Sequence, residues 1–268
     1  MKILVGISGA SGVELSFCLL AALEKYAQKN DEIYAILSEG AKVSFWAENL
    51  ASNGENSAAA RHCERDEVEA WQSINLKKTS ILKAKNSINL NSTNSTQNSQ
   101  ISAPNTEKFI NLSQIPPPND EILTFCQKKF ALKKTHFFDD NNLAAAVSSG
   151  SFGIDKTIIA PCSTSTLAKI KAGFADTLIL RAAAVALKER KTLVLGVREI
   201  PFSTLALKQM AKLSKMGALI APPVYASYFG ARNLGDLQGF IVGKWLDLLG
   251  IEHKLYKKWR GVKKRASQ

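Results

Sequence analysis

The chain has 268 residues, of which 46% are hydrophobic and 22% charged, and its formal net charge is +12. This length and composition can bury one substantial core or two small ones, which excludes a chain that is disordered throughout. No apolar run reaches the roughly 20 residues of a membrane helix, and we expect no secretory signal. The cysteines have neither disulfide-framework nor zinc-site spacing, which favours a reducing, cytoplasmic setting; they are Cys18, Cys63, Cys126 and Cys162.

The net charge is unevenly distributed. Residues 251–268 alone carry a net +6, half of the excess, and they form a basic C-terminal tail. The chain has no RRM, KH or helix-turn-helix pattern. We therefore expect no nucleic-acid and no membrane partner, although a non-catalytic nucleic-acid-binding protein stays open as an alternative.

The first 50 residues predict a β-α-β-α unit. An apolar run over 2–8 is followed by a glycine-rich loop and by a helix over 13–27, in which leucines recur at helical spacing. A second strand is expected over 32–37 and a second helix over 39–49.

The middle of the chain, 51–135, has a different character. Between 86 and 100 nearly every residue is Asn, Ser, Thr or Gln, and such a segment buries too little apolar surface to offset its ordering entropy. We expect a partly disordered Asn/Ser-rich insertion with an amphipathic helix near 120–132. The prediction is thus a single domain over 1–250, with its core in 1–50 and 136–250, and a tail over 251–268.

Regular alternation resumes after residue 136. Strands are expected over 156–160, 192–197 and 218–221, and helices from Thr164, over 203–215 and over 234–249, with a basic helix end near 187–191. Apolar strands flanked by helical periodicity are typical of a parallel sheet covered on both faces. The predicted fold is α/β, a doubly wound parallel sheet in a Rossmann/flavodoxin-like three-layer sandwich.

Ligands of such sheets bind beyond the carboxyl ends of the strands. After the first strand, small residues over 6–12 would let the backbone approach an anion at a helix N-terminus. The glycine spacing is not the dinucleotide fingerprint, and Ser38 rather than an acidic residue closes the second strand. This favours a mononucleotide over NAD, although a simple tight turn remains an alternative.

Four hydroxyl residues, 163–166, follow the strand over 156–160. One of them could be a helix N-cap, but four in succession favour a phosphate cradle. Cys162 is interpreted as a small buried thiol rather than a nucleophile. Arg198 and Glu199 close another strand, and with Lys188 they would form a positive site with one carboxylate, suited to phosphate binding with proton transfer.

These motifs together resemble the UbiX/Pad1 family of flavin prenyltransferases over about 1–50 and 136–250. The resemblance is carried, in family order, by segments 9–12, 149–152, 160–163, 181–183, 187–190 and 198–201 and by the region of Tyr228. It implies metal-independent transfer of a dimethylallyl group from dimethylallyl phosphate to N5 and C6 of reduced FMN. The product, prenylated FMN, is the cofactor of UbiD-type decarboxylases, and the enzyme is expected to be a large homo-oligomer, a dodecamer, whose sites are completed by neighbouring subunits.

The resemblance also implies residue roles. FMN would be bound by Gly9, Ala10, Ser11, Ser38, Ser163, Thr164, Ser165, Thr166 and Arg198. Dimethylallyl phosphate would be held by Arg181, Lys188, Tyr228 and Lys244. The catalytic polar residues would be Ser11, Glu48, Lys188 and Glu199, and no metal is expected.

Two positions depart from the family pattern. Lys244 stands where many members carry Arg, which keeps the charge but loses the bidentate fork and leaves the preference between mono- and diphosphate donors open. Leu143 stands where some members place an aromatic residue, for which Phe45, Trp46 or the flavin could substitute. A related FMN-dependent cysteine decarboxylase of the pantothenoylcysteine type is an alternative, but it needs a catalytic histidine, and His62, His136 and His253 all lie outside the motif loops. A non-catalytic flavin-binding protein is the other alternative.

Overall fold

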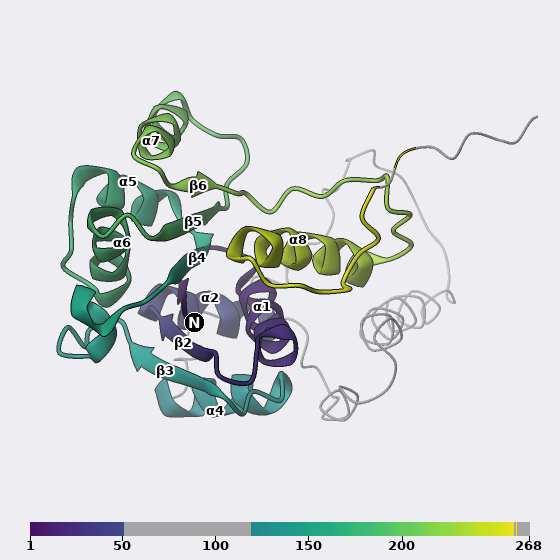
Figure 1. Cartoon of the computed structure of the whole chain (residues 1–268), viewed down its shortest axis with the longest axis horizontal. Helices are drawn as coiled ribbons and strands as arrows, with labels where there is room; N and C mark the ends of the chain where they lie inside the picture. Colours follow the sequence, from purple (N-terminus) through teal and green to yellow (C-terminus); the bar gives the residue numbers. More distant parts are fainter. Residues whose placement is uncertain (51–118, 260, 262–268) are drawn as a thin grey trace, which may run out of the picture.

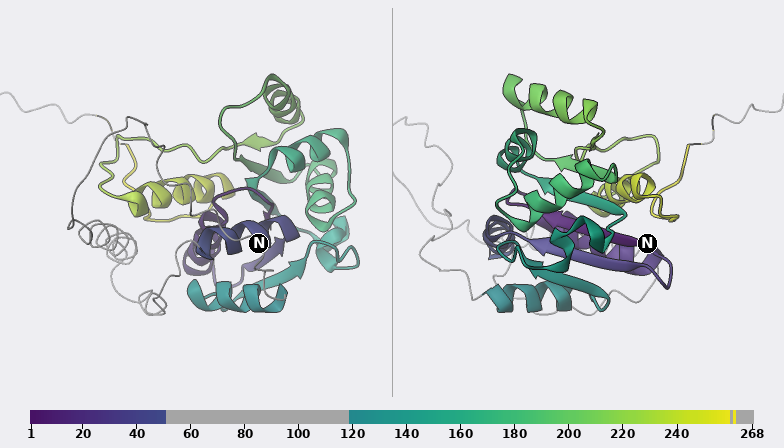
Figure 2. Two further views of the ribbon diagram at one scale, coloured as in Figure 1. Left: turned by 180° about the vertical axis from the view of Figure 1, so that it is seen from behind. Right: turned by 60° about the vertical axis from the view of Figure 1, so that its left-hand side comes forward.

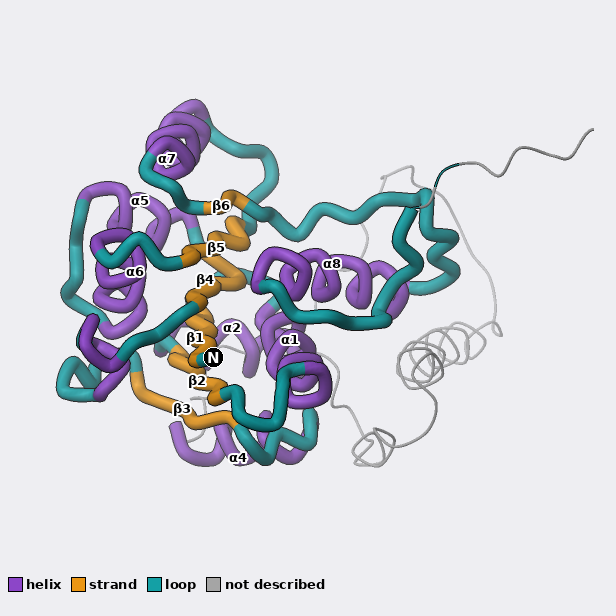
Figure 3. The backbone as a smooth tube through the Cα atoms, viewed as in Figure 1, coloured by secondary structure: helices purple, strands orange, loops and turns teal. Residues whose placement is uncertain are grey.

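A six-stranded parallel sheet organises the molecule, with strand order β3-β2-β1-β4-β5-β6. The computed structural model describes residues 1–50, 119–259 and 261, so most of the expected insertion and the end of the tail lie outside the described residues. The strands stack in one continuous row (Figure 3). Their bounds are β1 Lys2–Ile7, β2 Glu32–Leu37, β3 Thr135–Asp139, β4 Lys156–Cys162, β5 Thr192–Val197 and β6 Leu219–Ile220.

Helices cover both faces of the sheet (Figures 1 and 2). In Figure 1, α5 and α6 lie to the left of the sheet and α1 and α8 to the right. The predicted doubly wound α/β fold is therefore confirmed. The helix bounds are α1 Val13–Tyr26, α2 Glu39–Leu50, α4 Asn119–Lys129, α5 Thr164–Ala172, α6 Leu178–Lys188, α7 Thr204–Lys215 and α8 Leu234–Leu249, with 3-10 turns η2 Ala146–Ser148 and η3 Gly150–Phe152.

Alternate residues of each strand face opposite layers, as the two-residue period of a strand requires. Ile3, Val5 and Ile7 of β1 enter the core beneath α1 and α8, whereas Leu4 enters the core on the side of α6. All four are essentially inaccessible to solvent. The central strands are buried on both faces, which explains their continuous apolar runs.

The structure contains an edge strand that was not predicted, and it packs the predicted helix near 120–132 into the core rather than into a separate insertion. β3 pairs in parallel with β2, from Ile33 opposite Thr135 to Leu37 opposite Asp139. α4 contributes Ile122 and Cys126 to the buried cluster beneath α1. The end of the expected insertion, from residue 119 onward, therefore packs against the sheet.

Chain order reverses between β1 and β4. From β1 the chain moves outward to β2 and β3, and then crosses back to β4 on the other side of β1. The loops after β1 and β4 consequently diverge and leave a crevice at the carboxyl edge, the usual ligand position in open α/β sheets.

Candidate active site

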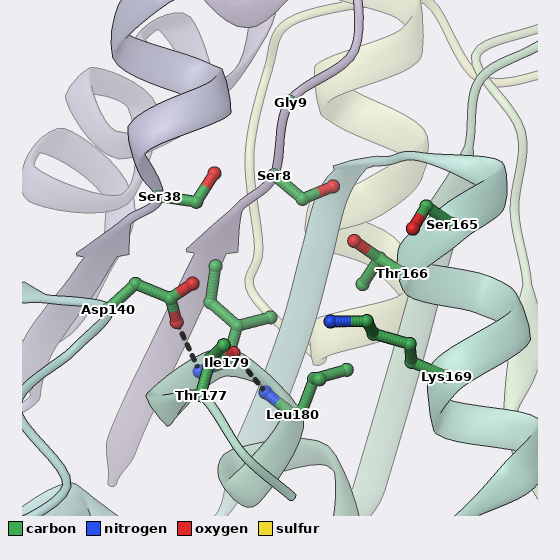
Figure 4. A pocket seen from close by; sticks show the side chains of 10 residues that line it. All are labelled: Ser8, Gly9, Ser38, Asp140, Ser165, Thr166, Lys169, Thr177, Ile179 and Leu180. Carbon is green, nitrogen blue, oxygen red and sulfur yellow. Dashed lines mark hydrogen bonds between the residues drawn. The ribbon is translucent and has the colours of Figure 1, made fainter. Parts of the chain in front are cut away.

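A cavity of about 110 Å³ lies at this switch point. In the close-up, hydroxyl groups of three loops converge on it from β1, β2 and α5, while the start of α6 closes the opposite wall (Figure 4). Its walls are predominantly polar, with hydroxyl, carboxylate and ammonium groups among them. The lining residues are Ser8, Gly9, Ser38, Asp140, Ser165, Thr166, Lys169, Thr177, Ile179 and Leu180.

Ser8 joins the two central loops. Its buried hydroxyl donates to the Pro161 carbonyl at 2.9 Å and accepts from the Ser163 backbone N–H, also at 2.9 Å. A third contact runs from the Ser8 backbone N–H to the same Pro161 carbonyl at 3.2 Å. The β1 and β4 loops are thus held at a fixed separation.

The loop after β1 passes directly against the start of α2. A Cβ atom on Gly9 would lie 2.9 Å from the Gly40 backbone, so no larger residue fits here without a shift. Gly12 adopts a left-handed conformation (φ 88°) at the N-cap of α1. Its N–H donates to the Glu48 carboxylate at 2.7 Å, and Ser11 beside it is exposed. Ser11 and Glu48, two predicted catalytic residues, therefore flank the same helix start.

The hydroxyl-rich turn forms the first turn of α5. Ser163 is the N-cap: its Oγ accepts from the Thr166 N–H at 3.1 Å and lies 2.9 Å from the Thr166 hydroxyl. The first N–H groups of any helix lack intrahelical acceptors, and the helix dipole adds a partial positive charge there. The side chains of Ser165 and Thr166 line the cavity, with Lys169 one turn further along (Figure 4). This turn is suited to an anion.

Asp140 fixes the opposite wall. Its Oδ1 accepts from the Ile179 N–H at 2.8 Å and its carbonyl accepts from the Leu178 N–H at 2.7 Å, so it caps α6 together with Thr177. Burial raises the pKa of Asp140, and its hydrogen bonds from α6 oppose that rise only in part. The capped end of α6 is thereby held against the cavity.

Arg198 and Glu199 follow β5 at the same edge of the sheet. The Arg198 N–H donates to the Cys162 carbonyl at 3.0 Å, which places this loop beside the start of α5. Both side chains are exposed, and the Glu199 carboxylate accepts from the Ile200 N–H. The predicted FMN residues from four separate loops thus lie along one edge.

Lys188 and Arg181 both lie on α6, apart from the loop that carries Arg198 and Glu199. Lys188 ends α6 just before β5 begins, so it lies at the amino edge of the sheet, where its Nζ pairs with Glu189 at 2.5 Å. Arg181 lies on the exposed side of α6 and donates from Nε to the Ser148 carbonyl at 3.0 Å. Within one chain, the structure does not bring these cations together with Arg198 and Glu199.

Tyr228 and Lys244 lie near each other at α8. The Tyr228 ring contacts that of Phe240 with 5.9 Å between centroids, and Lys244 follows Phe240 by one turn. Lys244 and Phe240 line a second, mostly apolar cavity of about 310 Å³, whose wall includes Trp245 and Tyr225. A cation at the rim of an apolar cavity suits a ligand with an anionic head and a hydrocarbon chain.

Several residues can be assigned structural roles or positions outside the cavities. Burial raises the pKa of the Cys162 thiol to about 12, which agrees with its interpretation as an inert thiol. Phe45 is buried in the core against Phe17, so it does not replace the aromatic residue absent at the exposed Leu143. The described histidines, His136 and His253, line neither cavity. No cluster of three or more metal-ligating side chains occurs in the described ranges.

The fold and the cavity define an α/β protein with a nucleotide-type site at the switch point of its sheet. A family model described as Flavoprotein matches residues 1–245. Flavin prenyltransferase UbiX of Campylobacter jejuni is 46% identical over 260 residues, which cover 97% of this chain and 99% of the relative. UbiX of Thermoplasma acidophilum is 45% identical over 125 residues, 47% of this chain and 69% of the relative. The chain belongs to the UbiX flavin prenyltransferase family.

Two solved structures share the fold over nearly the whole chain. A dodecameric FMN-dependent UbiX-like decarboxylase from Escherichia coli O157:H7 is 28% identical, with a TM-score of 0.64 and coverage of 97% of this chain and 100% of its own. AnUbiX (PadA1), in complex with FMN and dimethylallyl pyrophosphate, is 27% identical, with a TM-score of 0.63 and 98% coverage of both chains. The cavity reported above lies where the sheet topology of this fold binds nucleotides.

Six lining residues were not among the predicted site residues: the polar Ser8, Asp140, Lys169 and Thr177 and the apolar Ile179 and Leu180. Lys169 follows Ser165 by one helical turn, so helical periodicity on the predicted helix from Thr164 could have found it. Asp140 directly follows β3, and it was missed because that strand was not predicted. Ser8 closes the first strand, in the loop that was singled out for its glycines.

Proposed function

We propose that this chain transfers the dimethylallyl group of dimethylallyl phosphate to N5 and C6 of reduced FMN and releases inorganic phosphate. The observation that carries the proposal is the polar cavity at the switch point, formed by the glycine loop after β1, the hydroxyl turn that starts α5 and the capped start of α6. Membership of the flavin prenyltransferase family supports the same reaction.

FMN would be held at the carboxyl edge by Gly9, Ala10, Ser11 and Ser38 on one side and by residues 163–166 on the other. The N–H groups of the α5 first turn and the ammonium of Lys169 suit a phosphate group. At about 110 Å³, the cavity is smaller than the ~300 Å³ or more of a typical ligand pocket. It therefore accommodates part of the nucleotide, and Arg198 would contact the portion that extends along the edge.

The donor phosphate would be bound by Tyr228 and Lys244 of one chain and by Arg181 and Lys188 of a neighbouring copy. The position of Lys188 at the amino edge, with its side chain 55% exposed, supports a role outside its own cavity. The dodecameric assembly of the E. coli relative supports a large homo-oligomer here, as expected from the family.

Ser11, Glu48 and Glu199 would perform the proton chemistry. Reduced FMN supplies the nucleophilic N5 and C6, and transfer breaks the C1–O bond of the donor. Cations and the Tyr228 phenol would stabilise the charge that develops on the departing phosphate. Glu199, beside Arg198, would relay a proton at that edge. The Glu48 carboxylate accepts from the Gly12 N–H and would orient the Ser11–Gly12 loop.

The product would be delivered to a UbiD-type decarboxylase. Cys126 and Cys162 are buried free thiols in the part of the chain that the structure describes, which supports the proposed reducing, cytoplasmic setting. In the described parts of the chain, no helix has the length and apolarity to cross a membrane.

Anaerobic incubation with reduced FMN and dimethylallyl phosphate, followed by mass spectrometry of the flavin, tests the proposal. We expect a mass gain of one C5 unit. An unchanged flavin, in a preparation that binds FMN, would refute it.

A further inference from the structure

The segment after α8 folds back along that helix. Gly239 and Gly243 lie one turn apart on α8 and face this returning segment. A Cβ atom on Gly243 would lie 2.6 Å from the Tyr256 ring and 2.7 Å from the His253 ring, whereas one on Gly239 would lie an ordinary 3.5 Å from the Leu255 carbonyl. The closest approach of the segment is therefore at Gly243.

One carboxylate, that of Asp247, holds this segment. Its Oδ1 accepts from Lys258 Nζ at 2.9 Å and lies 3.3 Å from His253 Nε2, while its Oδ2 accepts from the Tyr256 hydroxyl. The side chain of His253 is completely buried. Three residues of the returning segment thus converge on a single acidic group of α8.

Lys244 forms a loose ion pair with the same carboxylate, at a distance too long for a hydrogen bond. Its Nζ is 3.9 Å from Asp247 Oδ2, the oxygen that accepts the hydrogen bond of the Tyr256 hydroxyl. The Lys244 side chain is 50% exposed. Residues three apart on a helix are neighbours that readily form ion pairs. Without the Tyr256 hydroxyl, the Lys244 ammonium, which already lies within ion-pair distance of Oδ2, would be free to approach to hydrogen-bond distance.

We propose that Tyr256 is a positioning residue: by donating to Asp247 Oδ2, it keeps the Asp247–Lys244 ion pair loose, at 3.9 Å, and leaves the Lys244 ammonium available to bind the donor phosphate. The inference rests on the proposed function of Lys244. It adds a reason for the folded-back segment, which contributes the donor that keeps an acidic neighbour from competing with the substrate for a cation.

Asp247 can compete with the donor phosphate for Lys244 because its carboxylate is charged. Burial would raise the pKa of Asp247, but the Tyr256 and Lys258 hydrogen bonds and the nearby His253 together lower it. The carboxylate is therefore ionised at neutral pH and attracts any available cation. An exposed pair of this kind is worth up to about 1 kcal/mol, which corresponds to roughly a fivefold change in a binding constant.

Tyr256→Phe tests the inference with the smallest change, because it removes only the hydroxyl and keeps the ring against Phe240. We expect the KM for dimethylallyl phosphate to rise about fivefold while FMN affinity stays unchanged. Adding Asp247→Asn should restore KM, since a neutral amide cannot capture Lys244. A KM that does not change in Tyr256→Phe, or that rises further in the double variant, would overturn the inference.

A second readout does not depend on turnover. Limited acetylation with acetic anhydride, quantified by mass spectrometry of the Lys244 peptide, reports how tightly this amine is paired with Asp247. We expect about threefold slower labelling in Tyr256→Phe, because pairing favours the charged amine, and wild-type labelling in the double variant. Equal labelling in all three proteins would refute the inference even if no prenylated flavin forms, whereas a flavin that stays unmodified in the wild type refutes only the proposed function.

Gly239 and Gly243 of α8 provide a matched pair of variants. Gly243→Ala introduces a Cβ that displaces Tyr256, so we expect the same KM increase and slower Lys244 labelling as in Tyr256→Phe. Gly239→Ala makes the same chemical change one turn away, where the Cβ has room, and should behave as wild type. Equal behaviour of the two alanine variants would contradict the role of the folded-back segment.

Discussion

The Ser163 backbone N–H donates a 2.9 Å hydrogen bond to the hydroxyl of Ser8. This bond joins the loop after β1 to the loop after β4, the two strands between which the chain order reverses. The same hydroxyl donates to Pro161, so its donor and acceptor capacities are both used. Two of the three hydrogen bonds that set the separation of these loops therefore come from one side chain.

Ser8→Ala should weaken FMN binding roughly tenfold, equivalent to about 1.4 kcal/mol, because the loops lose both side-chain hydrogen bonds between them and keep only the Ser8 N–H to Pro161 carbonyl bond. It should also lower the free energy of unfolding by ~1–3 kcal/mol, since Ser163 N–H and Pro161 O lose a buried partner. Ser203→Ala is the control: it removes the N-cap of α7, away from the cavity, at a cost of about 1 kcal/mol. FMN titration and urea unfolding measure both effects. Equal FMN affinities in the two variants would contradict the role of Ser8.

Lys169→Met should weaken binding of FMN but not of riboflavin, which lacks the phosphate. Lys169 lines the cavity one turn after Ser165, and its pairing with Asp176 is a loose 3.4 Å contact. Loss of one phosphate contact from a partly exposed cation should reduce FMN affinity by about fivefold. Lys171→Met, at an exposed position on the same helix, should have no effect. A parallel loss of riboflavin affinity would show that Lys169 does not act on the phosphate.

The central strands were predicted correctly because strands buried on both faces leave continuous apolar runs. β3 was missed for the opposite reason: Thr135–Asp139 is an edge strand whose residues are only partly buried, so its sequence is half polar. Without β3, Asp140 had no predicted place at the carboxyl edge. The loops with glycine and hydroxyl motifs were predicted because small residues and helix caps leave local signals.

The spatial grouping of the cations did not follow from chain order. Lys188 and Arg198 are ten positions apart, but β5 lies between them and carries them to opposite edges of the sheet. Cavity residues such as Ser8 and Thr177 act through contacts with segments far away in sequence, and a single sequence does not reveal these contacts.

Glu24→Gln should destabilise the protein in a pH-dependent way. The Glu24 carboxylate accepts from the backbone N–H groups of Lys133, Lys134 and Thr135 and from the Thr135 hydroxyl, and so fixes the entry to β3. Burial alone would raise the pKa of Glu24, but these hydrogen bonds lower it below the usual value of 4.5. A lowered pKa contributes stability above the unfolded-state pKa, and this contribution is lost as pH falls through the folded-state value.

Urea unfolding at pH 7 should therefore show a loss of about 2 kcal/mol in Glu24→Gln, and the difference from wild type should shrink below pH 4.5. Glu121→Gln, at an exposed position on α4, should match wild type at both pH values. A Glu24→Gln deficit that is independent of pH would show that the charge of the carboxylate does not matter.

Lys188→Ala and Glu199→Gln should complement each other in mixed oligomers. Each variant alone should lose turnover while retaining FMN binding. If Lys188 serves a neighbour's site, random co-assembly of equal amounts restores both groups in about a quarter of the sites. Co-expression with two affinity tags, followed by turnover assays of the doubly purified oligomer, measures the recovery. Complete inactivity of the mixed oligomer would place both residues in the site of one chain.

Prenyl transfer itself is tested most directly by a single-turnover reaction under anaerobic conditions, with enzyme-bound reduced FMN and one equivalent of dimethylallyl phosphate. Phosphate release and flavin mass are followed in the same sample. The proposed reaction predicts one phosphate released for each flavin that gains a C5 unit, because breaking the donor C1–O bond is coupled to bond formation at N5. Phosphate release without a change in flavin mass, or no reaction in an FMN-loaded preparation, would contradict it.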